Sequence, residues 1–162
     1  MAEKIDFKIR KGGEKDFSAL LSLFREEAVH DGSNPGVVKN SVAQMKKEKK
    51  HINFFVAEQN KKVVACAVYF IVYYTWAGKS LYLDDLFVKE KYRGGGIGTQ
   101  LLNKVFEVAA KENCNRLSWQ VEEKNKLAQN FYKKLGARFG DKWFNCDFDK
   151  NGIKSFIKAQ KQ

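Results

Sequence analysis

The segment YRGGGIGTQLL, residues 92–102, places four glycines within five positions, behind an arginine and ahead of an apolar run. Each interior glycine weakens a helix or a strand by roughly 0.5–1 kcal/mol, so a need for bare backbone explains this segment better than regular structure does. The first turn of a helix exposes unpaired N–H groups and carries roughly half a positive charge, and glycines let an anion approach those amides without meeting a Cβ. The segment therefore predicts a phosphate-binding turn, to which Arg93 adds a charge and Thr99 a hydroxyl.

Three phosphate-binding patterns use glycines in this way. The Rossmann pattern fails because its third glycine is replaced by Thr99 or Leu101, depending on where counting starts, and the Walker pattern fails because no Gly-Lys-Ser/Thr follows. The third pattern, Arg-x-x-Gly-x-Gly between a strand and a helix, is satisfied by Arg93, Gly96 and Gly98. A tight strand-to-helix turn without a ligand is the structural alternative at this point.

The elements that must position this turn follow from apolar periodicity and turn residues. Strands are expected at residues 5–10, 54–58, 63–74, 80–88, 116–121 and 139–148, and QNKK joins the second and third of them as a hairpin. Helices are expected at 14–30, at 38–50, from the glycines to about 112, from an Asn125 cap to a Gly136 stop, and in the tail. This order predicts an α/β fold with a mixed central β-sheet flanked by helices, in a single domain over residues 1–162.

Composition limits the partners. The formal net charge of +11 favours anionic partners, although a solvated lysine-rich surface explains much of it. Three widely spaced cysteines and two histidines suggest neither a disulfide framework nor a metal site. MAEKIDF is charged, unlike a signal peptide, and the longest apolar run, Val63–Tyr74, is too short to span a bilayer. We therefore expect no metal, no membrane partner and a reducing, cytoplasmic setting.

Two blocks of the sequence resemble the GNAT superfamily of N-acetyltransferases. YLDDLFVKEKYRGGGIGTQLL is similar to the strand, loop and R/Q-x-x-G-x-G/A turn that holds the CoA pyrophosphate in that family, and NKLAQNFYKKLGA is similar to its later helix. The resemblance covers about residues 5–148 and implies the GNAT acyl-CoA N-acyltransferase fold with acetyl-CoA as cosubstrate. The turn that it assigns to the cofactor consists of Arg93, Gly94, Gly95, Gly96, Ile97, Gly98 and Thr99.

The stretch YYTWAGKSLYLDDLFV is similar to the spermidine/spermine acetyltransferase branch, which also contains thialysine acetyltransferases. The resemblance implies transfer of an acetyl group to a primary amine of a small molecule by direct attack in a ternary complex. An alkyl amine, with a pKa near 10, is protonated at neutral pH. The enzyme then needs a proton acceptor, an oxyanion donor and a proton donor for the CoA sulfur.

The same resemblance implies roles for individual residues. Tyr132 stands where the family has a tyrosine near the CoA sulfur, so it is the candidate acid, with a packing aromatic as the alternative. Asp84 stands where close relatives have Glu; as the candidate base it is one methylene shorter, which favours a water relay, and a structural carboxylate is the alternative. The further cofactor residues are Leu86, Phe87 and Val88, whose strand backbone binds pantetheine and supplies the oxyanion donor, with Asn125, Tyr132 and Lys134.

The amine site implied by this branch consists of Asp31, Trp76, Asp84 and Asp85. Carboxylates pair with an ammonium group and an aromatic face can support it. Tyr74 replaces an aspartate of polyamine-acetylating relatives, so a small amine of the thialysine or lysine kind is expected at least as much as spermidine. Alternation sends Asp84 and Asp85 to opposite faces of a regular strand, and a family bulge in this strand would change that direction. The branch also implies a homodimer.

Three alternatives stay open. A protein or peptide N-acetyltransferase of the same fold needs an open groove, and this basic surface would repel basic peptides. A nucleic-acid-binding module could use the cluster Lys46–Lys50, but no helix-turn-helix, RNP or zinc pattern is present, so no nucleic-acid partner is expected. The third alternative is a CoA-binding regulator without catalysis, since Asp84 replaces Glu.

Overall fold

A computed structural model describes residues 6–140, 146 and 148–159. The chain groups into two compact units, Met1–Gln120 and Val121–Gln162. The first unit contains the strands β1 (Lys8–Lys11), β2 (Asn53–Gln59), β3 (Lys62–Tyr74), β4 (Gly78–Val88) and β5 (Arg116–Ser118), with the helices α1 (Phe17–His30), α2 (Val42–Lys47) and α3 (Ile97–Lys111). The second contains α4 (Lys126–Lys134) and α5 (Lys150–Ala159). The single-domain organisation stays a prediction.

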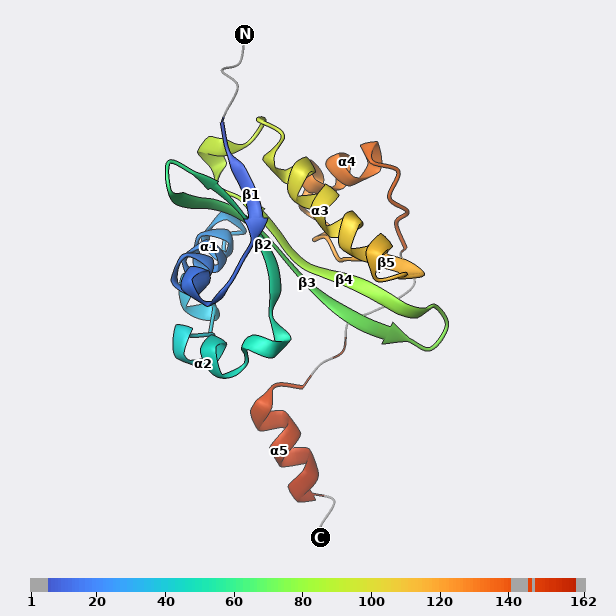
Figure 1. The fold of residues 1–162 in the computed structure, drawn as a ribbon. Coiled ribbons are helices and arrows are strands. Elements are labelled where there is room, and N and C mark those ends of the chain that lie inside the picture. The colour runs from blue at the N-terminus through green and yellow to red at the C-terminus, as the bar shows by residue number, and fades with distance from the viewer. Residues whose placement is uncertain (1–5, 141–145, 147, 160–162) are drawn as a thin grey trace. The chain divides into compact units, whose positions relative to one another are not determined.

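The five strands form one sheet in the order β1-β2-β3-β4-β5 (Figure 1). The pairs β1–β2, β2–β3 and β3–β4 are antiparallel, and the pair β4–β5 is parallel. The predicted α/β fold with a mixed sheet is therefore confirmed. The hairpin between β2 and β3 is confirmed as well: Asn60 and Lys61 both have positive φ, 48° and 62°, as a type I′ turn requires.

Helices cover both faces of this sheet, with α1 and α2 on one side and α3 on the other (Figure 1). Alternate residues of β2 and β3, Phe54, Val56, Cys66 and Val68, pack with the buried residues of α1. The other face is covered by the buried residues of α3, which are Ile97, Leu101, Leu102, Val105 and Ala109.

The strand expected at 5–10 is β1, Lys8–Lys11, and three further predicted elements differ more from the structure. The helix expected at 38–50 is only Val42–Lys47, because Ser41 caps it by accepting a hydrogen bond from the Gln44 N–H at 3.2 Å. The strand expected at 116–121 ends at Ser118. Most of the range 139–148 lies outside the described residues, and the described residues of that range, Phe139, Gly140, Cys146 and Phe148, are not in a strand.

The predicted limits of α4 are confirmed. The Asn125 side chain accepts a hydrogen bond from the Ala128 N–H at 3.0 Å, which caps the first turn. After the helix, Gly136 has φ +84° and its N–H bonds to the Lys133 carbonyl at 3.0 Å. The tail is helical as predicted, in α5. None of the helices in the described part of the chain combines the length and apolar character that a bilayer span requires.

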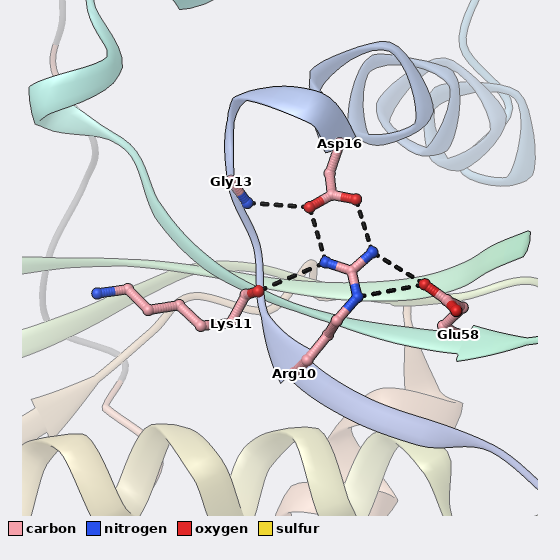
Figure 2. Close-up of polar contacts among 5 residues, drawn as sticks. All are labelled: Arg10, Lys11, Gly13, Asp16 and Glu58. Atoms are coloured by element: carbon pink, nitrogen blue, oxygen red, sulfur yellow. Dashed lines mark hydrogen bonds and ion pairs between the residues drawn. The ribbon is translucent and has the colours of Figure 1, made fainter. Parts of the chain in front are cut away.

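An arginine ties the edge of the sheet to the start of α1 (Figure 2). The Arg10 guanidinium on β1 donates two hydrogen bonds to the Asp16 carboxylate, at 2.8 and 2.7 Å, and two to Glu58 Oε2 on β2, at 3.2 and 2.9 Å. Asp16 is only 5% exposed and also accepts the Gly13 N–H at 2.9 Å. The bidentate contact with Arg10 lowers the pKa of Asp16, which keeps this buried carboxylate charged.

We expect Arg10→Met to lower the free energy of unfolding by about 3 kcal/mol, because it leaves the buried Asp16 charge without its partner. Urea unfolding near neutral pH measures this. The matched control is Lys104→Met, which removes the 2.7 Å ion pair with Glu107 from the exposed surface of α3. It should change stability by less than about 1 kcal/mol. Equal effects of the two substitutions would show that the Arg10 network does not stabilise the fold.

Candidate active site

Strand β4 contains a bulge at Asp84. In its pairing with β3, Asp85 lies opposite Val68 and Leu83 lies opposite Tyr69, so Asp84 has no partner on β3. Asp84 is the most exposed residue of β4, whereas the Oδ1 atom of Asp85 is buried. The bulge that the resemblance to the GNAT family predicted in this strand is therefore present, and the two consecutive carboxylates have different environments.

The same strand has an open edge. The parallel strand β5 pairs with β4 only at Ser80, Leu81 and Tyr82. From Leu83 to Val88, β4 has no strand neighbour on that side among the described residues. An unpaired strand edge presents backbone N–H and C=O groups, so this edge, which includes Leu86 and Phe87, can bind an extended ligand through its amides.

A fourth carboxyl group joins the three aspartates, and the sequence analysis missed it. Glu27, near the end of α1, lies within hydrogen-bonding reach of Asp85, and both Asp31 and Asp84 are close enough to act on it electrostatically. Burial, followed by the Asp85 charge, raises the pKa of Glu27 to about 9. Burial also raises the pKa of Asp85, to about 6, and that of Asp84.

The sequence contains a signal for Glu27. Leu20 and Phe24 lie at helical spacing on the apolar stripe of α1, and Glu27 continues that stripe at seven residues from Leu20. A carboxylate on a buried stripe needs a partner or a function. The pattern could have been noticed, but the partner, Asp85 on β4, becomes apparent only in the fold.

The glycine turn follows β4. Gly94 and Gly96 have φ +81° and +82°, a conformation that favours glycine. The helix α3 starts after Gly96, and its first backbone bond runs from the Gln100 N–H to the Gly96 carbonyl at 3.0 Å. The amides of Ile97, Gly98 and Thr99 precede that bond and so have no acceptor within the helix. A Cβ at Gly94 or Gly96 would meet no atom within 4 Å, so the space above the turn is open.

Arg93 lies between the open edge and this turn. Its Nε donates a hydrogen bond to the Val88 carbonyl at 2.8 Å, and its Nη1 is 3.0 Å from His30 Nε2. The guanidinium carbon also lies 5.5 Å from the centre of the Phe87 ring. These contacts hold the arginine at the end of β4, beside the glycines.

The sequence profile of the "Acetyltransferase (GNAT) family" matches residues 18–137. This chain belongs to the GNAT family. The fold agrees: an integron cassette protein from V. cholerae is 26% identical with a TM-score of 0.74, covering 94% of this chain and 98% of that one. A predicted acetyltransferase from Clostridium acetobutylicum, solved with acetyl-CoA, has a TM-score of 0.73 at 21% identity, over 88% of this chain and 96% of that one, and shows the fold alone.

Curated relatives indicate the branch of the GNAT family to which this enzyme belongs. The thialysine N-epsilon-acetyltransferase of Sus scrofa is 34% identical and that of Bos taurus 36% identical, each over 141 residues that cover 80% of this chain and 83% of the relative. The L-ornithine N5-acetyltransferase of Arabidopsis thaliana is 33% identical over 107 residues, which are 65% of this chain and 47% of that protein. The predicted GNAT family and its amine-acetylating branch are therefore confirmed.

The structure of this acetyltransferase brings some predicted site residues together. Asp84 and Asp85 are consecutive in β4. Asp31, which follows α1, is close enough to Asp85 for its negative charge to raise the pKa of Asp85. Trp76 lies in the turn between β3 and β4 and is 91% exposed. From the start of β4 at Gly78 to Asp84 there are six positions, roughly 20 Å at the usual rise along a strand. Within one chain the fold does not bring Trp76 to the aspartates.

The remaining predicted residues of the enzyme belong to the second unit. Asn125 uses its Oδ1 as the cap of α4, Tyr132 is buried beside Phe131 with ring centres 5.2 Å apart, and Lys134 is exposed. Their roles toward the thioester and the cofactor stay predictions. Among the described residues, no three His, Cys, Asp or Glu side chains are grouped so that they could hold a metal ion.

The raised pKa of Glu27 makes stability depend on pH. The ordinary value is 4.5 and the folded value about 9, so between these values the folded chain holds a proton that the unfolded chain has released. Stability contributed by this group therefore falls as pH rises through that window, by at most about 1.4 kcal/mol per pH unit. Glu27→Gln cannot ionise, so we expect its free energy of unfolding to decrease less than that of the wild type between about pH 5.5 and 8.5.

Urea unfolding at several pH values measures this difference. The matched control is Glu26→Gln, which removes the neighbouring carboxylate that pairs with Lys89 at 2.6 Å outside the cluster. We expect its pH slope to follow the wild type. A Glu27→Gln slope that also follows the wild type would contradict the assignment of a bound proton to Glu27.

Proposed function

We propose that this chain transfers an acetyl group from acetyl-CoA to a primary amine of a small molecule of the lysine or diamine class, by direct attack in a ternary complex. The observation that carries this is the juxtaposition of a carboxyl cluster with the open edge of β4. Asp84 and Val88 are four residues apart, about 13 Å along a strand, and the glycine turn begins beyond Val88. The extended pantetheine arm of CoA suits such a span between a thioester and a diphosphate.

The cofactor contacts follow from this placement. The amides at Ile97, Gly98 and Thr99 face a diphosphate at the positive end of α3, and glycine at 94, 95, 96 and 98 lets it approach. Arg93 adds a charged donor. The backbone of Leu86, Phe87 and Val88 bonds the pantetheine amides, and the N–H of Leu86 or Phe87 stabilises the thioester oxygen as it gains charge. Asn125 and Lys134 complete the set.

The reaction needs one proton transfer before attack and two after it. The substrate ammonium gives a proton to Asp84, directly or through water, and partial burial supports this role because it raises the pKa of Asp84. The neutral nitrogen then forms a bond to the thioester carbon, and it loses its second proton to solvent as the carbon–sulfur bond breaks. The departing sulfur takes a proton from the Tyr132 hydroxyl, which regains one from solvent.

The relatives support an amino acid with a side-chain amine as the acceptor. Thialysine and L-ornithine, which appear in the names of the relatives, are both of this kind. A protein named "Spermidine/spermine N(1)-acetyltransferase-like protein 1" aligns over only 77 residues of this chain. The position where polyamine-acetylating relatives have an aspartate is Tyr74 here, so it offers no carboxylate. The Tyr74 ring instead stacks with the Arg116 guanidinium, whose carbon lies 5.2 Å from the ring centre. A long polycation therefore loses one partner.

The position of Trp76 bears on the oligomeric state of the enzyme. Trp76 is too far along the β3–β4 ribbon to contact a small amine that also contacts Asp85 of the same chain. Its proposed place in the amine site therefore requires a second copy, which supports the homodimer that the family resemblance implies. We also propose a cytoplasmic enzyme that has no membrane or nucleic-acid partner.

An assay of thiol release from acetyl-CoA over thialysine, lysine, ornithine, putrescine and spermidine tests the function. We expect kcat/KM to be higher for the amino acids than for spermidine. Asp84→Asn and Tyr132→Phe should each lower kcat by about 10²-fold or more, the usual size of acid–base catalysis. Absence of thiol release with every amine would reject the function, a preference for spermidine would reject the amino-acid acceptor, and full activity of both variants would reject the two roles.

A pair of glycine substitutions tests the diphosphate site. Gly98 lies inside α3, and a Cβ there would be 3.7 Å from Val88 Cγ2, an ordinary contact, so Gly98→Ala should fold as well as the wild type or better. It places a methyl group over the first turn, and we expect the KM for acetyl-CoA to rise at least about tenfold while that for the amine stays unchanged.

Gly96→Ala is the comparison for that experiment. Its φ of +82° makes alanine cost about 1–2 kcal/mol of stability. Unfolding by urea separates the two substitutions: Gly96→Ala should lose stability and Gly98→Ala should not. An unchanged KM for acetyl-CoA in a stable Gly98→Ala variant would argue against a diphosphate at this turn.

A further inference from the structure

Glu27 lies outside the family motifs and yet faces the proposed amine site. It extends from α1 toward β4, where its carboxyl group lies within hydrogen-bonding reach of that of Asp85. Asp85 Oδ2 lies 3.8 Å from the Cys66 Sγ, a weak donor, and Asp85 Oδ1 is buried and has no donor among the described residues. A buried oxygen without a donor is unfavourable, so this atom requires either a proton on Glu27 or a ligand that donates.

The charges around the pair are all of one sign. Asp31 from α1 and Asp84 from β4 act on both members, and the buried Cys66 thiol on β3 contributes no positive charge. The cations nearby are engaged elsewhere: Lys89 pairs with Glu26 at 2.6 Å and Arg93 bonds the Val88 carbonyl. In the part of the chain that the structure describes, no Lys, Arg or His forms an ion pair with these four carboxyl groups.

We propose that Glu27 and Asp85 share one proton in the free enzyme and release it to solvent when a substrate ammonium group binds to them. Before binding, protonated Glu27 donates to Asp85 Oδ1. After binding, both groups are carboxylates and the ammonium hydrogens take the place of the shared proton. The pair thus gains one negative charge on binding a cation, without carrying two charges in an empty site. This inference rests on the proposed amine substrate.

The physical reason is the cost of like charges. Two carboxylates in contact cannot both ionise near neutral pH, and one of them keeps its proton. The pKa of Glu27, which burial and Asp85 raise to about 9, agrees with Glu27 as the holder of that proton. A bound ammonium reverses the balance, since an opposite charge within about 4–6 Å favours the charged form. Glu27 is accordingly a specificity residue for cationic acceptors.

Carbon-13 NMR of the side-chain carboxyl groups tests the proton directly in the intact chain. Labelled Glu and Asp are observed in the free protein and with saturating thialysine, without acetyl-CoA so that no turnover occurs, and Glu27→Gln assigns the Glu27 signal. We expect the Glu27 signal to be that of a protonated acid near pH 7 in the free protein and of a carboxylate once thialysine is bound. An ionised Glu27 in the free protein overturns the proposal, and so does a Glu27 that stays protonated in the complex.

Kinetics supplies a second readout that a purely structural role would not move. The side-chain amide introduced by Glu27→Gln would keep a hydrogen bond to Asp85 but could not ionise. This substitution should therefore raise the KM for thialysine at least about tenfold, the value of one charged hydrogen bond, with the KM for acetyl-CoA within about twofold. Glu26→Gln is the matched control and should change neither. An unchanged KM for thialysine in Glu27→Gln overturns the proposal.

The two proposals fail in different ways. If the wild type binds and acetylates no amine, the proposed function and this inference fail together. The wild type could instead acetylate thialysine normally while Glu27 is ionised in the free protein, or while Glu27→Gln leaves the KM for thialysine unchanged. In that case only the shared proton is rejected.

Discussion

Strand β4 loses its parallel neighbour after Tyr82, and the placement of the site depends on this interruption. A sheet that continued to pair would use the backbone amides that face this edge, including that of Leu86 or Phe87, in its own ladder and leave none for a ligand. The open edge coincides with the bulge at Asp84, where one carboxylate is exposed and the next lies near Glu27 of α1. The Arg93 side chain donates a hydrogen bond to the Val88 carbonyl at the end of the strand, so the glycine turn starts where the open edge ends.

The chain treats buried carboxylates in two different ways. Asp16 is held by a bidentate contact with Arg10, which keeps its charge and stabilises the fold. Glu27 and Asp85 have no such cation, and a raised pKa reduces the negative charge that they carry in the buried site. Burying a carboxyl group with no partner has a cost that the first arrangement avoids. The second arrangement is therefore best explained by a ligand that brings the missing positive charge, since a structural role would be better served by an arginine.

Much of this organisation could be predicted from the sequence, and the exceptions have local causes. Apolar periodicity located the long strands and helices, and the glycine pattern identified the turn before α3, because both depend on neighbouring residues. The length of the helix Val42–Lys47 was overestimated because its start depends on the Ser41 cap, which the expected range of 38–50 ignored. Glu27 was missed because its importance depends on Asp85, which is 58 residues further along the chain and reaches it only through packing of α1 on β4.

The distribution of charge separates the two substrates. A net charge of +11 attracts acetyl-CoA from a distance and repels a cationic amine. At physiological salt the field of exposed charges fades over roughly 8 Å, whereas partly buried groups are screened much less. Beyond that distance an amine meets little repulsion, and within it the carboxyl cluster dominates. A single basic surface can thus accept a polyanion at the glycine turn and a cation at the bulge, because the acidic groups are concentrated where β4 meets α1.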